Sequence, residues 1–201
     1  MPNEPSRARP RIATPRLLLL APDPDPAQGQ ARAVAEFYTR NRAHFAPWDP
    51  PLPADDNTPE AIQGRLMTGA AAFAAGQAHR WWLALADEPG RVIGSVHLSN
   101  LARGPFQSCT LGYALDVAAQ GGGLMHEALA AVIAEAFAPG INLHRIQAGV
   151  RPENSRSLAV LARLGFADEG LARDYLYIDG AWRDHRMFAV TNPAFIQPAF
   201  W

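Results

Sequence analysis

The chain contains no lysine and a single cysteine. All 18 basic residues are arginines, against 19 acidic residues, and the formal net charge is −1. We ascribe the arginine usage, with the abundant alanine and proline, to a G+C-rich genome, and the balanced charge gives no electrostatic reason to expect a nucleic-acid partner. Cys109 has no second cysteine to pair with, which indicates a reducing compartment and a buried strand thiol.

Long apolar runs are also missing. No segment approaches the ~18 apolar residues that a membrane span needs, and the arginine-containing N-terminus lacks the apolar stretch of a secretory signal. We therefore expect a cytoplasmic protein without membrane contact. A hydrophobic content of 48% over 201 residues can form one core.

Three segments are predicted along the chain. Residues 1–13 form a flexible N-terminal arm, 14–192 a single domain, and 193–201 a C-terminal tail. Residues 196–201 are either a dimer contact or a mobile end, so both a monomer and a homodimer stay open.

Hydrophobic periodicity predicts an alternation of strands and helices. Thr58 before Pro59 has the pattern of a helix N-cap, and Asp179-Gly180 that of a hairpin turn. Strands are predicted at 16–21, 81–86, 92–101, 109–115, 144–150, 174–178 and 182–190, and helices at 27–42, 58–75, 126–137 and 154–164. This order is typical of an α/β (α+β) fold with a mixed sheet.

The most informative stretch is 111–129, where a strand pattern is followed by three glycines and then a helical pattern. Glycines before a helix N-terminus allow backbone N–H groups to point at a phosphate. The sequence lacks the Gly-Lys-Ser/Thr ending of a Walker A loop and the G-x-G-x-x-G spacing of a dinucleotide site. A diphosphate is therefore expected at residues 120–125, although three glycines alone could equally form a plain connection.

Eight segments together resemble a known family. They are 41–50 (NRAHFAPWDP), 99–104 (SNLARG), 111–113 (LGY), 120–129 (QGGGLMHEAL), 144–146 (HRI), 151–157 (RPENSRS), 161–166 (LARLGF) and 174–185 (DYLYIDGAWRDH). The chain resembles the Rim branch of the GNAT superfamily, the ribosomal-protein N-terminal alanine acetyltransferases. The resemblance implies a GNAT fold, in which a mostly antiparallel central sheet is splayed in the middle and carries helices on both faces.

The resemblance also implies acetyl-CoA as cosubstrate and direct, sequential transfer to the N-terminal α-amine of a ribosomal protein. The cofactor arm would pair with the strand end, and the glycine loop would hold its pyrophosphate. The implied cofactor residues are Leu115, Asp116, Val117, Gln120, Gly121, Gly122, Gly123, Leu124, Met125, Asn154 and Ser157. Gly122 departs from the family, which often has Lys or Arg there, so we expect somewhat weaker binding.

For proton donation to the leaving thiolate, the resemblance implies Ser157. Many superfamily members use a tyrosine where this chain has Leu161, and Tyr175 or Tyr177 could replace it. Asn154 is either a helix N-cap or a partner of the pantetheine amide.

The general base is left open, because Leu176 stands where a related enzyme has glutamate. Asp174, Asp184 and His185 are candidates, and we expect Ser157, Asp174 and Tyr175 to be the catalytic residues. An N-terminal amine has a pKa of about 7.7–8.0 against about 10.4 for lysine, so a weak base suffices. Backbone N–H groups of residues 115–117 are the expected oxyanion donors.

Phe45, Trp48, Asn100 and Tyr113 are the expected acceptor-binding residues, although Trp48 fits a loop anchor equally well. The acidic residues near Trp48 are either solvated or attract a basic protein tail. No metal-ligand spacing is present, so no metal is expected. Two alternatives remain: an acetyltransferase for small amines such as polyamines or antibiotics, and a coenzyme-A-binding module without turnover.

Overall fold

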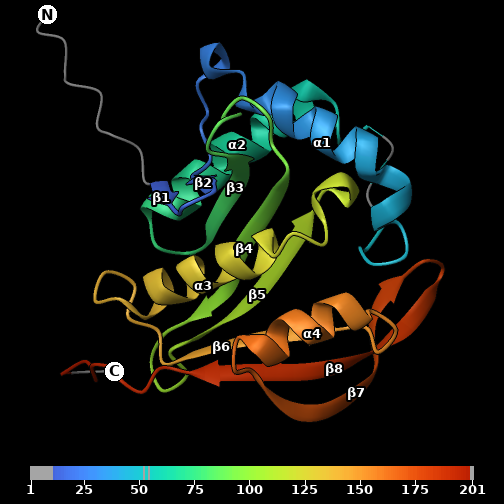
Figure 1. Cartoon of the computed structure of the whole chain (residues 1–201). Coiled ribbons are helices and arrows are strands. Elements are labelled where there is room, and N and C mark those ends of the chain that lie inside the picture. The colour runs from blue at the N-terminus through green and yellow to red at the C-terminus, as the bar shows by residue number, and fades with distance from the viewer. Residues whose placement is uncertain (1–10, 52, 54, 200–201) are drawn as a thin grey trace, which may run out of the picture.

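An eight-stranded sheet runs through the molecule in the order β1-β2-β3-β4-β5-β6-β8-β7 (Figure 1). The computed structural model describes residues 11–199 except 52 and 54. The strands are β1 (Arg11–Ala13), β2 (Leu17–Leu20), β3 (His79–Leu85), β4 (Gly94–Ala102), β5 (Ser108–Leu115), β6 (Arg145–Val150), β7 (Ala167–Ile178) and β8 (Ala181–Thr191). Every neighbouring pair is antiparallel except the parallel pair β5–β6, which confirms the predicted mixed, mostly antiparallel sheet.

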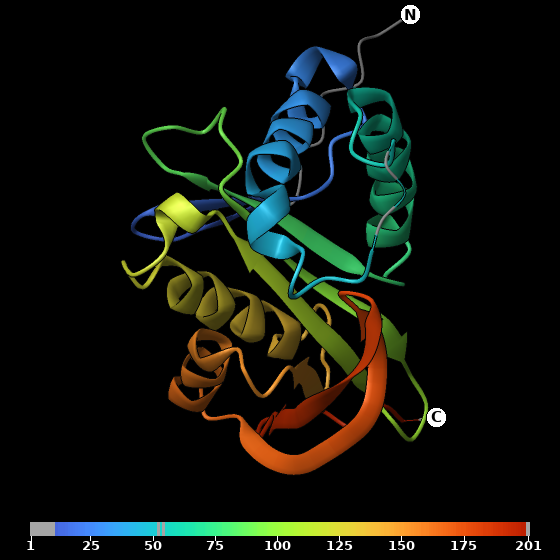
Figure 2. The ribbon, with the colours of Figure 1, turned by 90° about the vertical axis from the view of Figure 1, so that its right-hand side faces the viewer.

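Helices cover both faces of the sheet (Figure 2). α1 (Gln30–Phe45) and α2 (Pro59–Ala74) lie on one face, and α3 (Leu124–Phe137) and α4 (Ser155–Arg163) on the other. Two short 3-10 helices, η1 (Pro26–Gln28) and η2 (Val117–Ala119), complete the elements. The predicted cap of α2 is present, since Thr58 Oγ1 accepts a hydrogen bond from the Ala61 N–H at 3.2 Å.

Among the residues that the structure describes, no helix is both long and apolar enough to cross a bilayer.

The two faces of the sheet bury separate cores. Trp81 packs into the larger core with α3, whereas its neighbour Trp82 packs into the smaller core with α1 and α2. This follows from the alternation of side chains along a strand. Because both faces are covered, β3 has an almost continuous apolar sequence.

The sheet parts between β5 and β6. These strands pair only at Ser108–Arg145, Cys109–Ile146 and Thr110–Gln147. Beyond Thr110, β5 stays with β4 while β6 stays with β8, and the two separate in Figure 1. The predicted splay in the middle of the sheet is therefore confirmed.

The structure corrects the sequence interpretation at two places. Arg11–Ala13, assigned to a flexible arm, form β1 and pair with β2, while residues 1–10 of that arm lie outside the described residues. β7 begins at Ala167 and not at 174, because a bulge between Ala172 and Leu176 interrupts the alternation that marks a strand. Asp174 lies in that bulge with φ 48°, a left-handed conformation that aspartate tolerates better than most residues.

Part of the predicted tail is held against the domain. Asn142 Nδ2 donates to the Ile196 carbonyl at 2.7 Å, and the Ile196 N–H donates back to Asn142 Oδ1 at 3.2 Å. The Ile196 side chain stays exposed. Residues 200–201 of the tail lie outside the described residues, and the oligomeric state stays a prediction.

Candidate active site

The glycine loop leads from β5 to α3 and presents backbone N–H groups. Gly121 and Gly123 have positive φ angles of 86° and 75°, a region in which glycine is favoured. Gly122 does not have a positive φ angle. The first helical bond of α3 runs from the Glu127 N–H to the Gly123 carbonyl at 3.1 Å, so the N–H groups of Leu124 to His126 precede it and have no helical partner. Met125 buries its side chain, which fixes these N–H groups in place. The loop has the geometry of an anion site.

Arginines from other elements flank this loop. Arg16, next to β2, donates to the Gly122 carbonyl at 2.8 Å and pairs with Glu127 at 2.6 Å. Arg156 of α4 donates to Gln120 Oε1 at 2.6 Å. A hollow of about 580 Å³ beside the loop is lined by Pro15, Arg16, Gly121, Gly123, His126, Glu127 and Arg163. Two arginines that are distant in the sequence, Arg16 and Arg156, thus lie next to the loop that contains Gly122.

α1 holds the end of β5 in place. The fully buried Asn41 accepts a hydrogen bond from the Val117 N–H at 3.0 Å and donates to the Phe37 carbonyl at 2.9 Å. Asp116, also buried, receives Arg40 Nε at 2.6 Å and the Ala118 N–H at 3.1 Å. Desolvation raises the pKa of Asp116, but the hydrogen bonds from Arg40 and Ala118 outweigh it, so this pKa lies below its usual value.

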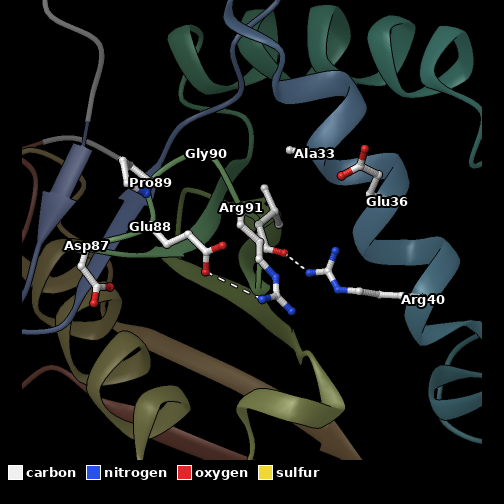
Figure 3. A pocket seen from close by; sticks show the side chains of 9 residues that line it. Ala33, Glu36, Arg40, Asp87, Glu88, Pro89, Gly90 and Arg91 are labelled. Carbon is white, nitrogen blue, oxygen red and sulfur yellow. Dashed lines mark hydrogen bonds and ion pairs between the residues drawn. The ribbon is translucent and has the colours of Figure 1, made fainter.

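A hollow of about 530 Å³ lies next to Arg40, between α1 and residues 87–92. Figure 3 shows side chains that line it. Arg40 reaches the Val92 carbonyl there, and Arg91 pairs with Glu88 at 3.7 Å. Arg91 also lies 3.7 Å from the Asp116 carboxylate. Both guanidinium groups therefore lie near the carboxylate of the buried Asp116. We interpret the hollow as part of the structure that supports the end of β5.

The structure corrects which backbone groups face the parted edge. The Asp116 N–H donates to the Ile93 carbonyl at 2.8 Å, and the Val117 N–H is bonded to Asn41. The sequence interpretation expected Asp116 and Val117 to offer their N–H groups to a ligand. This was wrong, because both N–H groups are already bonded within the protein. Since hydrogen bonding alternates along an antiparallel strand, the N–H groups of Leu115 and Tyr113 point away from β4, toward the gap.

Ser157 and Tyr113 meet beside the gap, on the α3/α4 face. Tyr113 Oη and Ser157 Oγ lie 2.5 Å apart, and either can donate. Burial raises the pKa of Tyr113 to about 12, against the opposing effect of the Ser157 hydrogen bond. The sequence interpretation grouped Tyr113 with the acceptor, whereas the structure pairs it with the expected proton donor.

Asn154 is the N-cap of α4. Its Oδ1 accepts the Ser157 N–H at 3.1 Å, so the cap interpretation is confirmed, and Nδ2 can still donate to a ligand. Leu161, at the position where many superfamily members have tyrosine, is fully buried in the larger core.

Phe45 is a core residue and not a groove wall. α1 extends to Phe45 and not only to residue 42, which puts Phe45 at helical spacing from Phe37 and Asn41. Its ring packs against Phe37 and Tyr38, and only 8% of the residue is exposed. The expected role of Phe45 in acceptor binding is therefore not supported.

Trp48 and Asn100 lie near the parted edge. The Arg151 guanidinium lies 5.4 Å from the centre of the Trp48 ring and donates to the Pro47 carbonyl, so Trp48 and its loop are fastened just beyond the end of β6. Asn100, with φ 51°, donates to the hydroxyl of Thr110 at 3.4 Å. Thr110 is the last β5 residue that pairs with β6, so Asn100 contacts β5 at the point where the gap begins.

The β7–β8 hairpin brings the remaining catalytic candidates to the edge of β6. Tyr175 and His185 pack against each other with ring centres 5.3 Å apart. Asp184 Oδ1 accepts the Asp174 N–H at 2.9 Å, which supports the bulge. Asp174 itself is exposed, and its catalytic role stays a prediction.

Sequence reasoning missed Arg16, Arg40, Asn41, Arg151 and Arg156. Asn41 carried a usable signal, since an amide on the apolar side of an amphipathic helix needs a buried partner. The arginines carried none, because their contacts join segments far apart in the sequence. Within the described residues, no three His, Cys, Asp or Glu side chains form a group that could hold a metal.

A parted sheet edge, a helix N-terminus for phosphates and a hydroxyl pair beside the gap define an acyltransferase of the N-acetyltransferase class. Comparison with known families agrees: residues 16–167 match the acetyltransferase (GNAT) domain, and the chain belongs to that family. The predicted family and fold are thereby confirmed.

Similar proteins include ribosomal-protein acetyltransferases. The chain is 41% identical over 184 residues to the [ribosomal protein uS5]-alanine N-acetyltransferase of Escherichia coli, covering 91% of each chain. The ribosomal-protein-S5-alanine acetyltransferase of Vibrio fischeri superposes with a TM-score of 0.87 at 34% identity, over 93% of this chain and 99% of that one. Mycobacterium smegmatis RimJ in complex with CoA-disulfide superposes with a TM-score of 0.80 at 31% identity, over 91% of this chain and 85% of that one.

Proposed function

We propose that this protein transfers the acetyl group of acetyl-CoA to the N-terminal α-amine of a ribosomal protein, with an N-terminal alanine of uS5 as the first candidate. The structural observation that carries the proposal is the parting of β5 from β6 directly beside the Tyr113–Ser157 pair. The 41% identity to the Escherichia coli enzyme supports this acceptor. We place the reaction in the cytoplasm.

Acetyl-CoA would bind mainly through backbone groups. Its pyrophosphate would lie on the N–H groups from Gly121 to His126, with Arg16 and Arg156 nearby. Its pantetheine arm would continue β5 along the gap, where Tyr113 and Leu115 offer unpaired backbone groups. Asn154 Nδ2 would meet an amide carbonyl of that arm.

In the transfer step, the amine nitrogen bonds to the acetyl carbon and the carbon–sulfur bond breaks. The thiolate takes the proton of the Ser157 hydroxyl. Tyr113 donates a hydrogen bond to Ser157 Oγ, so the Ser157 proton can point toward the thiolate. The Tyr113 N–H would stabilise the oxyanion, and the Leu115 backbone groups would hold the pantetheine arm. A weak base suffices, because an N-terminal amine has a pKa of only about 7.7–8.0.

The test is a thiol-release assay with acetyl-CoA and peptides that begin with alanine, serine or methionine, with polyamines in parallel. An alanine peptide whose N-terminus is already acetylated but which carries an internal lysine is the matched control. We expect release with the free alanine peptide and none with the control. Release with polyamines alone would show a small-amine enzyme, and acetyl-CoA binding without any release would show a binding module.

Mass spectrometry of ribosomal proteins from a deletion strain tests the acceptor in the cell. We expect one ribosomal protein to be about 42 Da lighter at its N-terminus, because an acetyl group is replaced by a hydrogen atom. Unchanged N-termini would exclude a ribosomal acceptor.

A further inference from the structure

A histidine lies over the parted edge on the face opposite Ser157. His97 of β4 is paired with Gly112 of β5 and with Arg80 of β3. A Cβ atom built on Gly112 would lie 2.4 Å from both Cε1 and Nε2 of His97. The imidazole ring therefore occupies the space that a side chain at position 112 would need.

The position of Gly112 relates His97 to the hydroxyl pair. Successive strand residues point to opposite faces, so Tyr113 meets Ser157 on the α3/α4 face while Gly112 lies under His97 on the α1/α2 face. Both residues follow Thr110, where the pairing of β5 with β6 ends. The gap thus has Ser157 on one face and His97 on the other. The β5 residues that they contact, Tyr113 and Gly112, are adjacent in the sequence.

The other edge of the gap has a matching arrangement. Gly149 of β6 is on the same face as Gly112, because each lies two residues beyond the last pair, Thr110–Gln147. A Cβ atom on Gly149 would be 3.5 Å from Tyr175 Cε1 and 3.7 Å from His185 Cδ2. On this face, two glycines leave the strand edges bare and three rings lie above them.

The surroundings of His97 keep its ring neutral. Burial, followed by the positive charge of Arg80, lowers the pKa of His97 to about 3. Arg80 itself is near Tyr38 of α1, Arg65 of α2 and Asp49 of the following loop. Nδ1 of His97 is buried and has no hydrogen-bond partner among the described residues, while the side chain as a whole is only partly buried. A neutral imidazole has one unprotonated ring nitrogen, so His97 can accept a proton at pH 7.

Building on the proposed function, we propose that His97 contacts the α-amine of the acceptor and receives the proton that this amine loses as it attacks the acetyl carbon. The amine binds neutral, beside Arg80. As the nitrogen–carbon bond forms, its nitrogen becomes positively charged and strongly acidic, so it can pass a proton to the imidazole even though burial lowers the pKa of His97. The carbon–sulfur bond then breaks, and Ser157 protonates the thiolate on the other face. His97 returns the proton to solvent, and the hydroxyl pair takes one from solvent.

The direct test is His97→Asn, with His79→Asn as the matched control. His79 is also buried with an unpartnered Nδ1, but it stacks on Trp81 on the opposite face of the sheet. We expect kcat with the alanine peptide to fall roughly 100-fold in His97→Asn, the low end for loss of a general base. The calorimetric affinity for acetyl-CoA should not change, and His79→Asn should keep the wild-type kcat. An unchanged kcat in His97→Asn would overturn the proposal.

Two further measurements exclude a merely structural role. Added imidazole should restore part of the kcat of His97→Ala, because it can enter the space over Gly112. Gly112→Ala should lower kcat by displacing the ring, and should add no further loss in the His97→Ala background. Absence of rescue together with full additivity would overturn the assignment. If the wild-type protein releases no thiol with any acceptor, the proposed function itself fails, which is a distinct result from wild-type turnover that His97→Asn retains.

Discussion

The two faces of the parted sheet are built by different means. On the α3/α4 face, the proposed cofactor site consists mainly of backbone N–H groups at the glycine loop and along β5. On the α1/α2 face, the proposed acceptor site consists of side chains that come from β4, β8 and the Trp48 loop. A backbone site depends on local conformation, whereas a side-chain site depends on packing between distant segments.

The largest expected effect concerns the ion pair of Asp116 and Arg40, which holds the end of β5 against α1. Asp116→Ala would leave Arg40 without its carboxylate, and loss of one partner of a buried pair costs about 3 kcal/mol. Urea denaturation measures this free energy of unfolding. Asp116→Asn is the control that keeps the cap on Ala118, and we expect it to lose less. Equal stability of Asp116→Ala and wild type would show that α1 does not hold the strand end.

The same carboxylate predicts a pH dependence. Because the folded-state pKa of Asp116 is lowered, its contribution to stability is fully present above the unfolded-state pKa of about 3.9 and is lost as pH falls through the lower, folded-state pKa. The difference in unfolding free energy between wild type and Asp116→Asn should therefore shrink below about pH 4. A difference that grows on acidification would contradict this assignment.

Next in size is the hydroxyl pair. Ser157→Ala removes the proton donor to the thiolate, so kcat should fall roughly 100-fold while the KM for acetyl-CoA changes little. Tyr113→Phe keeps the ring in the core and removes only the hydrogen bond, so its effect should be smaller. Steady-state kinetics distinguishes the two. A larger loss in Tyr113→Phe would make the tyrosine the direct donor.

The smallest expected effects distinguish two of the loop glycines, Gly123 and Gly122. Gly123→Ala forces a side chain into a left-handed conformation and should cost about 1 kcal/mol of stability, with weaker acetyl-CoA binding. Gly122 has no positive φ and open space around its Cβ position, so Gly122→Ala should be neutral. Gly122→Arg should tighten acetyl-CoA binding in calorimetry by adding a cation. Unchanged or weaker binding would mean that Arg16 and Arg156 already satisfy the phosphates.

The difference between the faces also explains what the sequence could predict. The position of the glycine loop and, apart from β1, the order of the elements were predicted correctly, because glycine spacing and hydrophobic periodicity are local signals. The parting of the sheet was expected from the family resemblance, and the short pairing of β5 with β6 confirms it. The availability of the amides at 115–117 was not predictable, since the Val117 N–H is taken by Asn41, 76 residues away. Phe45 and Trp48 are both aromatic residues near the end of α1, and only the extra helical turn decides that Phe45 is buried. His97 reads as an ordinary strand residue until the register places it over Gly112.

The central claim is that acetyl-CoA and the acceptor occupy opposite faces of one gap at the same time. Initial rates measured while both acetyl-CoA and the alanine peptide are varied test it most directly. The account predicts intersecting double-reciprocal lines, as for a ternary complex. Parallel lines, with acetyl transferred to the protein before the peptide binds, would contradict it.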